Sequence, residues 1–334
     1  MRIAHCCFFA AALCLCAAAN VEPLGLVLSG GGAKGAYEVG VWQELQAAGL
    51  TSNVTVISGT SVGALNAALF ATKPESAEKI WLEKMKGVFA INTNRVGQSI
   101  QKTMNDVSNA VVVAEKTGKR WKGFMSLALA TGLRLADDYV REVGTGESRI
   151  GYIDSAKLAT ALDEVLFREW PSIPSVYVTA LEKGGGMSKT WRLNAEPHER
   201  RVLMLRASSA IPVGFDTVII DDKVYVDGGW ESNGGNNVPI DPILKNHHDV
   251  KTVIVVYLEN EKRLNAVRRA KNNEAASAQK IRQIEIIPSE NINGMFGIGG
   301  AFDTRPETAR RLIELGRKDA REALTKSGMI KVGK

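Results

Sequence analysis

Two short apolar runs, each ending at glycine and leading into a helical pattern, constrain the fold of this chain most. The first run is Leu24–Leu28, and the second, rich in β-branched residues, is Val54–Ile57. Runs of this length that stop at glycine are typical of buried strands. Residues 33–48 place apolar side chains on one helical face, and residues 64–70 are rich in alanine and leucine. The order strand, helix, strand, helix predicts an α/β fold with a parallel sheet and right-handed crossovers.

The rest of the chain continues this pattern without an internal repeat or a long linker. Residues 85–146 are mostly polar and have a helical pattern, with no role that we can assign. We therefore predict a single domain over residues 20–334. Further strands are expected at residues 176–181, 217–220, 224–226, 253–258 and 284–287, and further helices at residues 263–279 and 306–324.

The first residues have the composition of an export signal. Arg2 gives a weakly positive start, residues 3–15 are almost wholly apolar, and Ala17–Ala19 has the small-residue pattern that signal peptidase cleaves. The apolar run is shorter than the roughly 20 residues that a spanning helix needs. We predict a signal peptide over residues 1–19 and a secreted, periplasmic or envelope-associated protein. An uncleaved membrane anchor, or a lipid on Cys16, is the alternative.

Composition indicates an ordinary globular protein with a basic surface. Of its residues 45% are hydrophobic and 23% charged, and the formal net charge is +6. A basic surface can serve nucleic acid or anionic lipid. No aromatic–basic interleaving and no zinc-ligand spacing accompanies the charge, which argues against a nucleic-acid partner. For an exported protein, we expect an anionic membrane surface as the partner.

The sequence GTSVG at residues 59–63 matches a nucleophile elbow. In that motif a serine lies on a sharp strand-to-helix turn in a strained backbone conformation, and its neighbours must be small. Gly59 and Gly63 meet this requirement around Ser61. The pattern also occurs by chance as a glycine-rich turn, but the strand and helix on its two sides favour a nucleophilic serine.

Three consecutive glycines, Gly30, Gly31 and Gly32, begin the first helical pattern. They expose backbone N–H groups at the positive end of a helix, where an anion or a developing oxyanion is stabilised. Lys34 is a cation in the first helical turn and opposes the helix dipole. A negative group such as a lipid phosphate beside Lys34 would explain this placement, and a solvated lysine is the alternative.

The spacing of Gly30, Gly32 and Gly35 also matches a dinucleotide-binding loop, so a nucleotide-binding protein is a second hypothesis. Such a loop is accompanied by an acidic residue about 20 positions further on, at the end of the second strand. Here the second strand runs into Ser58–Ser61, which contains no carboxylate. An oxyanion hole explains both glycine motifs together, and a hydrolase is therefore the preferred reading.

A nucleophilic serine needs a base, and two kinds are available. His247 and His248 follow the serine in the chain order of a Ser-His-Asp esterase, but they lie in a polar stretch that resembles a solvated turn. Asp227 follows a strand-like run and precedes Gly228 and Gly229, which allow a sharp turn at the carboxylate. Asp227 is therefore better placed than either histidine, although a turn-forming aspartate is the usual meaning of a single DGG sequence.

Four motifs in this order together resemble the patatin-like phospholipase family. They are GGGAKG after the first strand, GTSVG after the second, ASSAIPVGF at residues 207–215, and DGG at residues 227–229. Residues 300–303 and the helical run at residues 307–320 are similar to the closing segment of the family. The ordered combination is far more specific than any single motif.

The resemblance implies a three-layer α/β/α fold and a lipid acyl hydrolase of the phospholipase A or lysophospholipase type. Ser61 would be the nucleophile, Asp227 the base and Gly30–Gly32 the oxyanion loop, while Lys34 would contact the substrate head group. Burial of the Asp227 carboxylate would raise its basicity. A phospholipid or other lipid ester would be the substrate, with no metal and no cofactor. A catalytically inactive lipid-binding relative is a third hypothesis, and the complete set of motifs argues against it.

The polar middle of the chain joins a basic cluster to an apolar run. Lys116, Lys119, Arg120 and Lys122 precede the run at residues 124–133. This segment is too short to span a bilayer but suits its interface. It would either contact lipid and cover the site as a lid, or form a buried cap helix with a solvated basic end.

Overall fold

The computed structural model describes residues 22–85, 155–166, 168–212, 214–230, 234–260, 266–293 and 303–331, together with residues 88, 153 and 301. One eight-stranded sheet passes through this part of the chain in the order β5-β6-β3-β2-β1-β7-β8, with β4 paired to β3. The strands are β1 Leu24–Leu28, β2 Val54–Thr60, β3 Ser175–Glu182, β4 Ser188–Arg192, β5 Val218–Ile220, β6 Lys223–Asp227, β7 Thr252–Val256 and β8 Arg282–Ile286.

The sheet is parallel over β3, β2, β1, β7 and β8, as predicted, and antiparallel where β4, β5 and β6 join it. Asp221 and Asp222 connect β5 to β6, and their φ angles of 50° and 61° form a tight hairpin turn. A two-residue turn can only return the chain antiparallel, which explains the pairing of β5 with β6. The sequence pattern did not predict β4, because none of its residues is fully buried and it has no apolar run.

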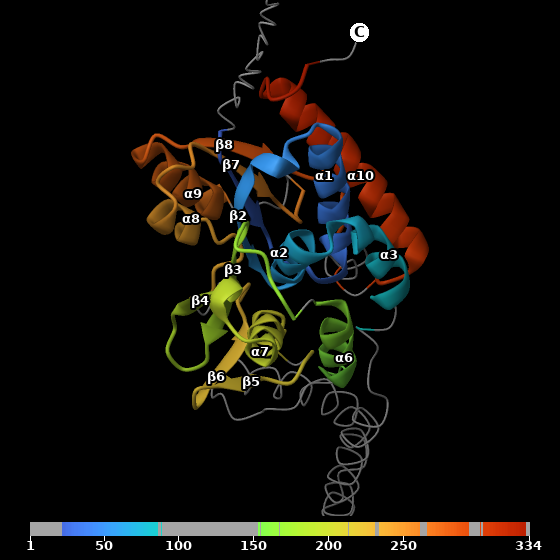
Figure 1. The fold of residues 1–334 in the computed structure, drawn as a ribbon, viewed down its shortest axis with the longest axis vertical. Coiled ribbons are helices and arrows are strands. Elements are labelled where there is room, and N and C mark those ends of the chain that lie inside the picture. The colour runs from blue at the N-terminus through green and yellow to red at the C-terminus, as the bar shows by residue number, and fades with distance from the viewer. Residues whose placement is uncertain are drawn as a thin grey trace, which may run out of the picture.

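Helices cover both faces of the sheet (Figure 1). The predicted helices at residues 33–48, 64–70, 263–279 and 306–324 are confirmed to within a few residues, whereas α6, α7 and α8 were not predicted. The α-helices are α1 Ala36–Ala47, α2 Val62–Thr72, α3 Ala77–Lys79, α6 Ser155–Val165, α7 His198–Ser208, α8 Asp241–Asn246, α9 Ala266–Ala278 and α10 Pro306–Lys326. Shorter turns are η1 Gly32–Gly35, η2 Thr51–Asn53, η3 Pro74–Ser76, η4 Ile80–Lys84, which is π-helical, and η5 Leu193–Ala195.

Two apolar cores, one on each face of the sheet, make the predicted three-layer arrangement. Leu26 and Leu28 of β1 pack on the face covered by α1, α2 and α10. Val27, between them, packs on the opposite face with residues of α8 and α9. Successive side chains of a strand point to opposite faces, so a strand covered on both sides must be apolar throughout. This is why the first strand could be recognised as an unbroken apolar run.

The first and last helices, α1 and α10, pack closely because each contributes a glycine to their contact (Figure 1). A Cβ atom on Gly40 would lie 1.9 Å from the carbonyl oxygen of Ile313, and one on Gly316 would lie 2.1 Å from that of Tyr37. The Tyr37 hydroxyl donates to Asp319 Oδ2 at 3.0 Å across the same contact. The helix that follows the glycine loop, α1, is thereby fixed to the last helix, α10.

Several predicted features lie outside the described residues. These include the signal peptide at residues 1–19 and the basic and apolar run of residues 116–133. Of the segment 85–146, the structure describes Met85 and Val88, both buried. In the described part of the chain, no helix combines the length and apolar character needed to cross a bilayer. The single-domain boundaries at residues 20–334 therefore stay a prediction.

Candidate active site

Ser61 lies between the last residue of β2 and the first residue of α2, with a φ angle of 55° and a ψ angle of −126°. This is the left-handed region that non-glycine residues rarely adopt, and strain of this kind is typical of functional turns. A Cβ atom on Gly59 would lie 2.3 Å from the carbonyl oxygen of Gly63, and one on Gly63 would lie 2.4 Å from that of Leu28. Both glycines are therefore required by the close approach of the backbone around Ser61, as the elbow motif predicted.

Ser208 holds the turn from the other side. Its Oγ accepts the Ser61 N–H at 2.8 Å and donates to the carbonyl oxygen of Thr179 at 2.6 Å. The Ser208 carbonyl accepts the Gly228 N–H at 3.3 Å. A single buried residue thus joins the elbow and strand β3 through its side chain, and the turn after Asp227 through its backbone carbonyl. Ser208 belongs to the ASSAIPVGF motif, but no local pattern assigns it a role, because its partners lie far away in the sequence.

Asp227 is the last residue of β6, and the register of the sheet places it near Ser61. Thr60 pairs with Thr179 on β3, and the next β3 residue, Ala180, pairs with Asp227. The serine turn and the carboxylate therefore leave the sheet at the same level, on strands separated by β3. A Cβ atom on Gly228 would lie 2.3 Å from the carbonyl oxygen of Thr179, so glycine is also needed directly after the carboxylate.

The Asp227 carboxylate is buried, with 6% of the residue exposed. Its Oδ1 accepts the Gly229 N–H at 2.7 Å. Burial raises its pKa from 3.8 to about 6, while hydrogen bonding from the Ser61 hydroxyl and the Gly229 N–H opposes the rise. Its Oδ2 has no partner in full hydrogen-bond geometry among the described residues. A desolvated carboxylate with an open oxygen beside a serine hydroxyl can accept a proton near neutral pH.

The glycine loop after β1 faces this pair across a pocket of about 420 Å³. Gly30 donates its N–H to the carbonyl of Asn237 at 3.2 Å, so this N–H is occupied and Gly30 shapes the loop. The N–H groups of Gly31 and Gly32 donate to no acceptor in the described part of the chain. A Cβ atom would lie 2.8 Å from Leu258 at Gly31, and 2.3 Å from the Ala301 carbonyl oxygen at Gly32. Two donors are therefore open to a ligand oxygen.

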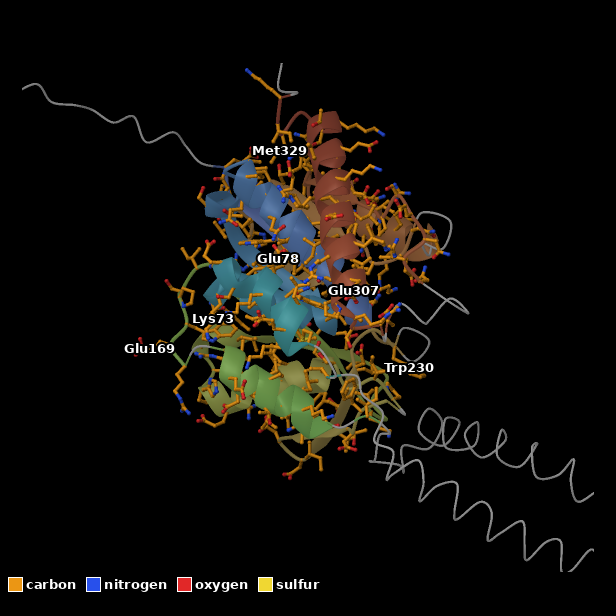
Figure 2. The ribbon with its side chains drawn as sticks, turned by 90° about the vertical axis from the view of Figure 1, so that its right-hand side faces the viewer. Lys73, Glu78, Glu169, Trp230, Glu307 and Met329 are labelled. Carbon is orange, nitrogen blue, oxygen red and sulfur yellow. The ribbon has the colours of Figure 1, made fainter. Side chains whose placement is uncertain are left out.

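Asn237 connects the glycine loop to the turn after Asp227 and was not among the predicted site residues. Its Nδ2 donates to the Gly30 carbonyl at 3.3 Å, which complements the bond from the Gly30 N–H. Its Oδ1 lies 2.6 Å from where a Cβ atom on Gly229 would be. Trp230, labelled in Figure 2, lines the same pocket next to this turn. Asn237 follows an ordinary polar stretch, so no local signal marked it.

Lys34 is buried, with 7% of the residue exposed, which contradicts the alternative of a solvated lysine. Its Nζ donates to the carbonyl of Leu258 at 2.7 Å and to Asn293 Oδ1 at 2.9 Å. The ammonium therefore ties the start of the first helix to the chain that follows β7. It also lines the pocket of Ser61. Contact of Lys34 with a substrate head group stays a prediction.

A buried polar network supports the glycine loop from behind. Asn66 of α2 donates from Nδ2 to the Gly35 carbonyl at 2.9 Å and to Glu38 Oε2 at 2.7 Å. Its Oδ1 accepts the Trp81 indole N–H at 2.8 Å. Burial raises the pKa of the Glu38 carboxyl well above its usual value. The network joins α1, α2 and η4, and none of its members was singled out from the sequence.

The histidines weighed as alternative bases lie elsewhere. His247 Nε2 is 3.2 Å from the Tyr177 hydroxyl, and the two rings meet edge to face. Neither His247 nor His248 lines the pocket of Ser61. His198, at the start of α7, bonds to Asp163 at 2.7 Å. Of the candidate bases, the structure therefore brings Asp227 into the pocket of Ser61, and neither His247 nor His248.

Fold and site together define an α/β protein in which a strained serine, a glycine loop and a buried aspartate surround one pocket. A family model described as patatin-like phospholipase matches residues 26–244. The chain therefore belongs to the patatin-like phospholipase family.

Individual relatives are more distant. A segment of 48 residues is 52% identical to lysophospholipase nte1 of Aspergillus terreus. The aligned segment covers 14% of this chain and 3% of that relative. VipD from Legionella pneumophila aligns with 91% of this chain and 67% of its own, at 17% identity and a TM-score of 0.45. Human GIVD cytosolic phospholipase A2 aligns with 92% and 59%, at 10% identity and a TM-score of 0.45.

Proposed function

We propose that this protein is a lipid acyl hydrolase that cleaves carboxylic esters through an acyl-enzyme on Ser61, with Asp227 as the base. The observation that carries the proposal is the buried Asp227 carboxylate, whose pKa is raised to about 6 beside the Ser61 turn. A carboxylate of ordinary pKa is a poor base for a hydroxyl, and desolvation makes it a better one.

In the first half of the reaction, Ser61 Oγ forms a bond to the ester carbonyl carbon while its proton moves to Asp227 Oδ2. The carbonyl oxygen becomes an oxyanion, which the N–H groups of Gly31 and Gly32 stabilise. Collapse of this intermediate breaks the bond to the alcohol, which leaves with the proton from Asp227. Backbone donors placed where negative charge develops are commonly the largest contribution to catalysis of this kind.

In the second half, water replaces the alcohol. Asp227 takes a proton from water as its oxygen attacks the acyl carbon, and the same two N–H groups hold the second oxyanion. Cleavage of the bond to Ser61 Oγ then releases the fatty acid, and the serine recovers its proton from Asp227. Each step uses the same carboxylate alternately as base and acid.

Phospholipids or lysophospholipids are the substrates that we propose within this class. The family and the name of the lysophospholipase relative support this choice. Lys34 supports it further, because this residue lines the pocket and its positive charge would favour an anionic head group.

The test is labelling with a fluorophosphonate probe together with lipid ester hydrolysis. The wild type should be labelled and active. Ser61→Ala should not be labelled, and both Ser61→Ala and Asp227→Asn should lose ester hydrolysis by several orders of magnitude. The double variant should be hardly worse than either single one, because the two groups act as a unit. Substantial hydrolysis by Asp227→Asn would contradict the pairing, and His247→Ala, which should remain active, is the matched control.

We also propose that the protein is exported after cleavage behind Ala19 and acts at an anionic membrane surface. The apolar residues 3–15 and the net charge of +6 support this. Mass spectrometry of the mature protein should find Asn20 at the N-terminus. An intact Met1 on protein recovered from the cell envelope would contradict cleavage.

A further inference from the structure

Asn293 lies in the chain after β8 and lines the pocket of Ser61 together with Lys34 and the glycine loop. The residue is only 3% exposed. Its backbone N–H donates to Asn291 Oδ1 at 3.0 Å, which shapes the turn that carries it. Asn293 is therefore a buried amide in the wall of the candidate active site, and the proposed mechanism gives it no role.

The orientation of the Asn293 amide is determined by its neighbour. The Lys34 ammonium can only donate hydrogen bonds, so the amide atom 2.9 Å from Lys34 Nζ must be the oxygen. The nitrogen, Nδ2, therefore occupies the other position. Nδ2 is buried and has no acceptor in the described part of the chain. The usual ambiguity between the oxygen and nitrogen of an asparagine does not arise here.

Buried amide donors are almost always paired, because leaving one unpaired carries the full cost of removing it from water. An unpaired donor that is held in place in the wall of a ligand pocket is suited to bind an acceptor atom of the ligand. The charged residues that line the same pocket are Lys34, Asp227 and Glu259. The acceptor needed is an oxygen, and a lipid ester provides such oxygens in its phosphate, ester and hydroxyl groups.

We propose that Asn293 Nδ2 donates a hydrogen bond to an oxygen in the polar part of the substrate and so determines specificity. This inference rests on the proposed lipid acyl hydrolase function. Asn293 has two separable roles in this proposal: Oδ1 holds Lys34, and Nδ2 binds the substrate. A variant that keeps the first role and removes the second distinguishes the proposal from a purely structural role.

Asn293→Asp is that variant, because a carboxylate still accepts from Lys34 but cannot donate. With a lysophospholipid substrate we expect kcat/KM to fall at least about tenfold, mainly through a higher KM. Asn293→Ala should fall at least as far. Asn291→Asp is the matched control: it adds the same charge to the same turn, keeps the acceptor for the Asn293 N–H, and does not line the pocket. It should retain wild-type kinetics.

Comparison with a neutral monoacylglycerol of the same acyl chain identifies which substrate oxygen accepts the hydrogen bond from Asn293 Nδ2. A loss confined to the lysophospholipid assigns a phosphate oxygen, and a loss on both substrates assigns an ester or hydroxyl oxygen. If Asn293→Asp is as active as Asn291→Asp on both while Asn293→Ala is impaired, Asn293 only holds Lys34 and the proposal is overturned. Ser61→Ala in the same assay distinguishes failure of the Asn293 proposal from failure of the proposed hydrolase function. Equal rates for Ser61→Ala and the wild type would contradict the hydrolase function itself.

A second measurement does not depend on the folding of Asn293→Asp. In the wild-type protein, a non-hydrolysable ether analogue of the lysophospholipid should shift the side-chain amide resonances of Asn293 and leave those of Asn291 unchanged. Saturating analogue without a shift at Asn293 would overturn the proposal.

Discussion

At the scale of single residues, the chemistry depends on where burial places two ionisable groups. Asp227 has its pKa raised to about 6 by burial, and the Lys34 ammonium is buried against two neutral oxygens. Neither property belongs to the residue type. Each follows from the burial of the side chain in the folded protein.

The raised pKa of Asp227 predicts the pH dependence of activity. The base must be ionised, and a carboxyl with a pKa of about 6 is protonated below that pH. We expect kcat/KM for a neutral soluble ester to rise through an apparent pKa near 6 and to fall about tenfold per pH unit below it. A pH–rate profile from pH 4 to 9 checks this. A profile that is flat down to pH 4 would show that the carboxylate is hydrated or is not the base.

The same shift predicts a stability effect. Folded Asp227 binds its proton more tightly than the unfolded chain, so its contribution to stability is full below pH 3.8 and is lost as pH rises through about 6. The difference of about two pKa units corresponds to about 3 kcal/mol, as an order of magnitude. Asp227→Asn should therefore raise the free energy of unfolding at pH 8 and change it little near pH 4. Urea denaturation at both pH values measures it, and equal effects at both would contradict the assignment.

Lys34 should matter for every substrate, because its Nζ holds the Leu258 carbonyl and Asn293 Oδ1. Lys34→Met leaves both acceptors unpaired, at about 1–3 kcal/mol each in unfolding free energy. We expect it to lower hydrolysis of a neutral short-chain ester, and to lower that of an anionic phospholipid further. An unchanged rate on the neutral ester would contradict the structural role of Lys34 in holding Leu258 and Asn293. Equal losses on both substrates would contradict contact with the head group.

At the scale of elements, the site is built where strands end. The glycine loop follows β1, Ser61 follows β2, and Leu258 and Glu259 follow β7, all at the carboxyl edge of the parallel part, where α/β proteins commonly bind ligands. The proposed base, Asp227, comes from the antiparallel hairpin of β5 and β6. The position of the glycine loop in turn depends on α1, which packs on α10.

The close contact of α1 and α10 predicts that Gly316→Ala destabilises the protein. Its Cβ atom would lie 2.1 Å from the Tyr37 carbonyl oxygen, and a helix backbone cannot move aside cheaply. We expect a loss of about 1–3 kcal/mol, visible as a lower Tm. Gly185→Ala is the control, because the nearest atom to its Cβ is a Glu182 side-chain atom at 3.5 Å. If both variants melt like the wild type, the two helices are less closely packed than described.

At the scale of the whole molecule, the described core forms the candidate active-site pocket, and contact with a lipid surface is proposed for a segment outside the described residues. Phe124 follows the basic cluster and lies outside the described residues. If this segment contacts lipid, Phe124→Ser should weaken binding to anionic vesicles and spare hydrolysis of a soluble ester. Vesicle sedimentation and thermal melting distinguish a lipid-contacting segment from a buried cap helix. A lower Tm with unchanged vesicle affinity would show that the segment is a buried cap.

The sequence by itself determined the local features: the first strands, four helices, the elbow around Ser61, the glycine loop and the DGG turn. These could be read because each depends on neighbours within a few residues, such as an apolar run that stops at glycine. Helix α7 was not predicted from the sequence, because charged residues interrupt its apolar ones. Strand β4 was not predicted because it is stabilised by pairing with β3 rather than by burial of its own side chains.

Only the tertiary structure decided how these pieces act together. Ser208 meets Ser61, Asn237 meets Gly30, and Asn293 meets Lys34 across more than 140 residues of sequence in every case. No local pattern encodes such contacts, because they arise from the packing of strands and turns that are distant in the chain. The pKa of Asp227 and the burial of Lys34 depend on that packing too, since both follow from which surfaces exclude water.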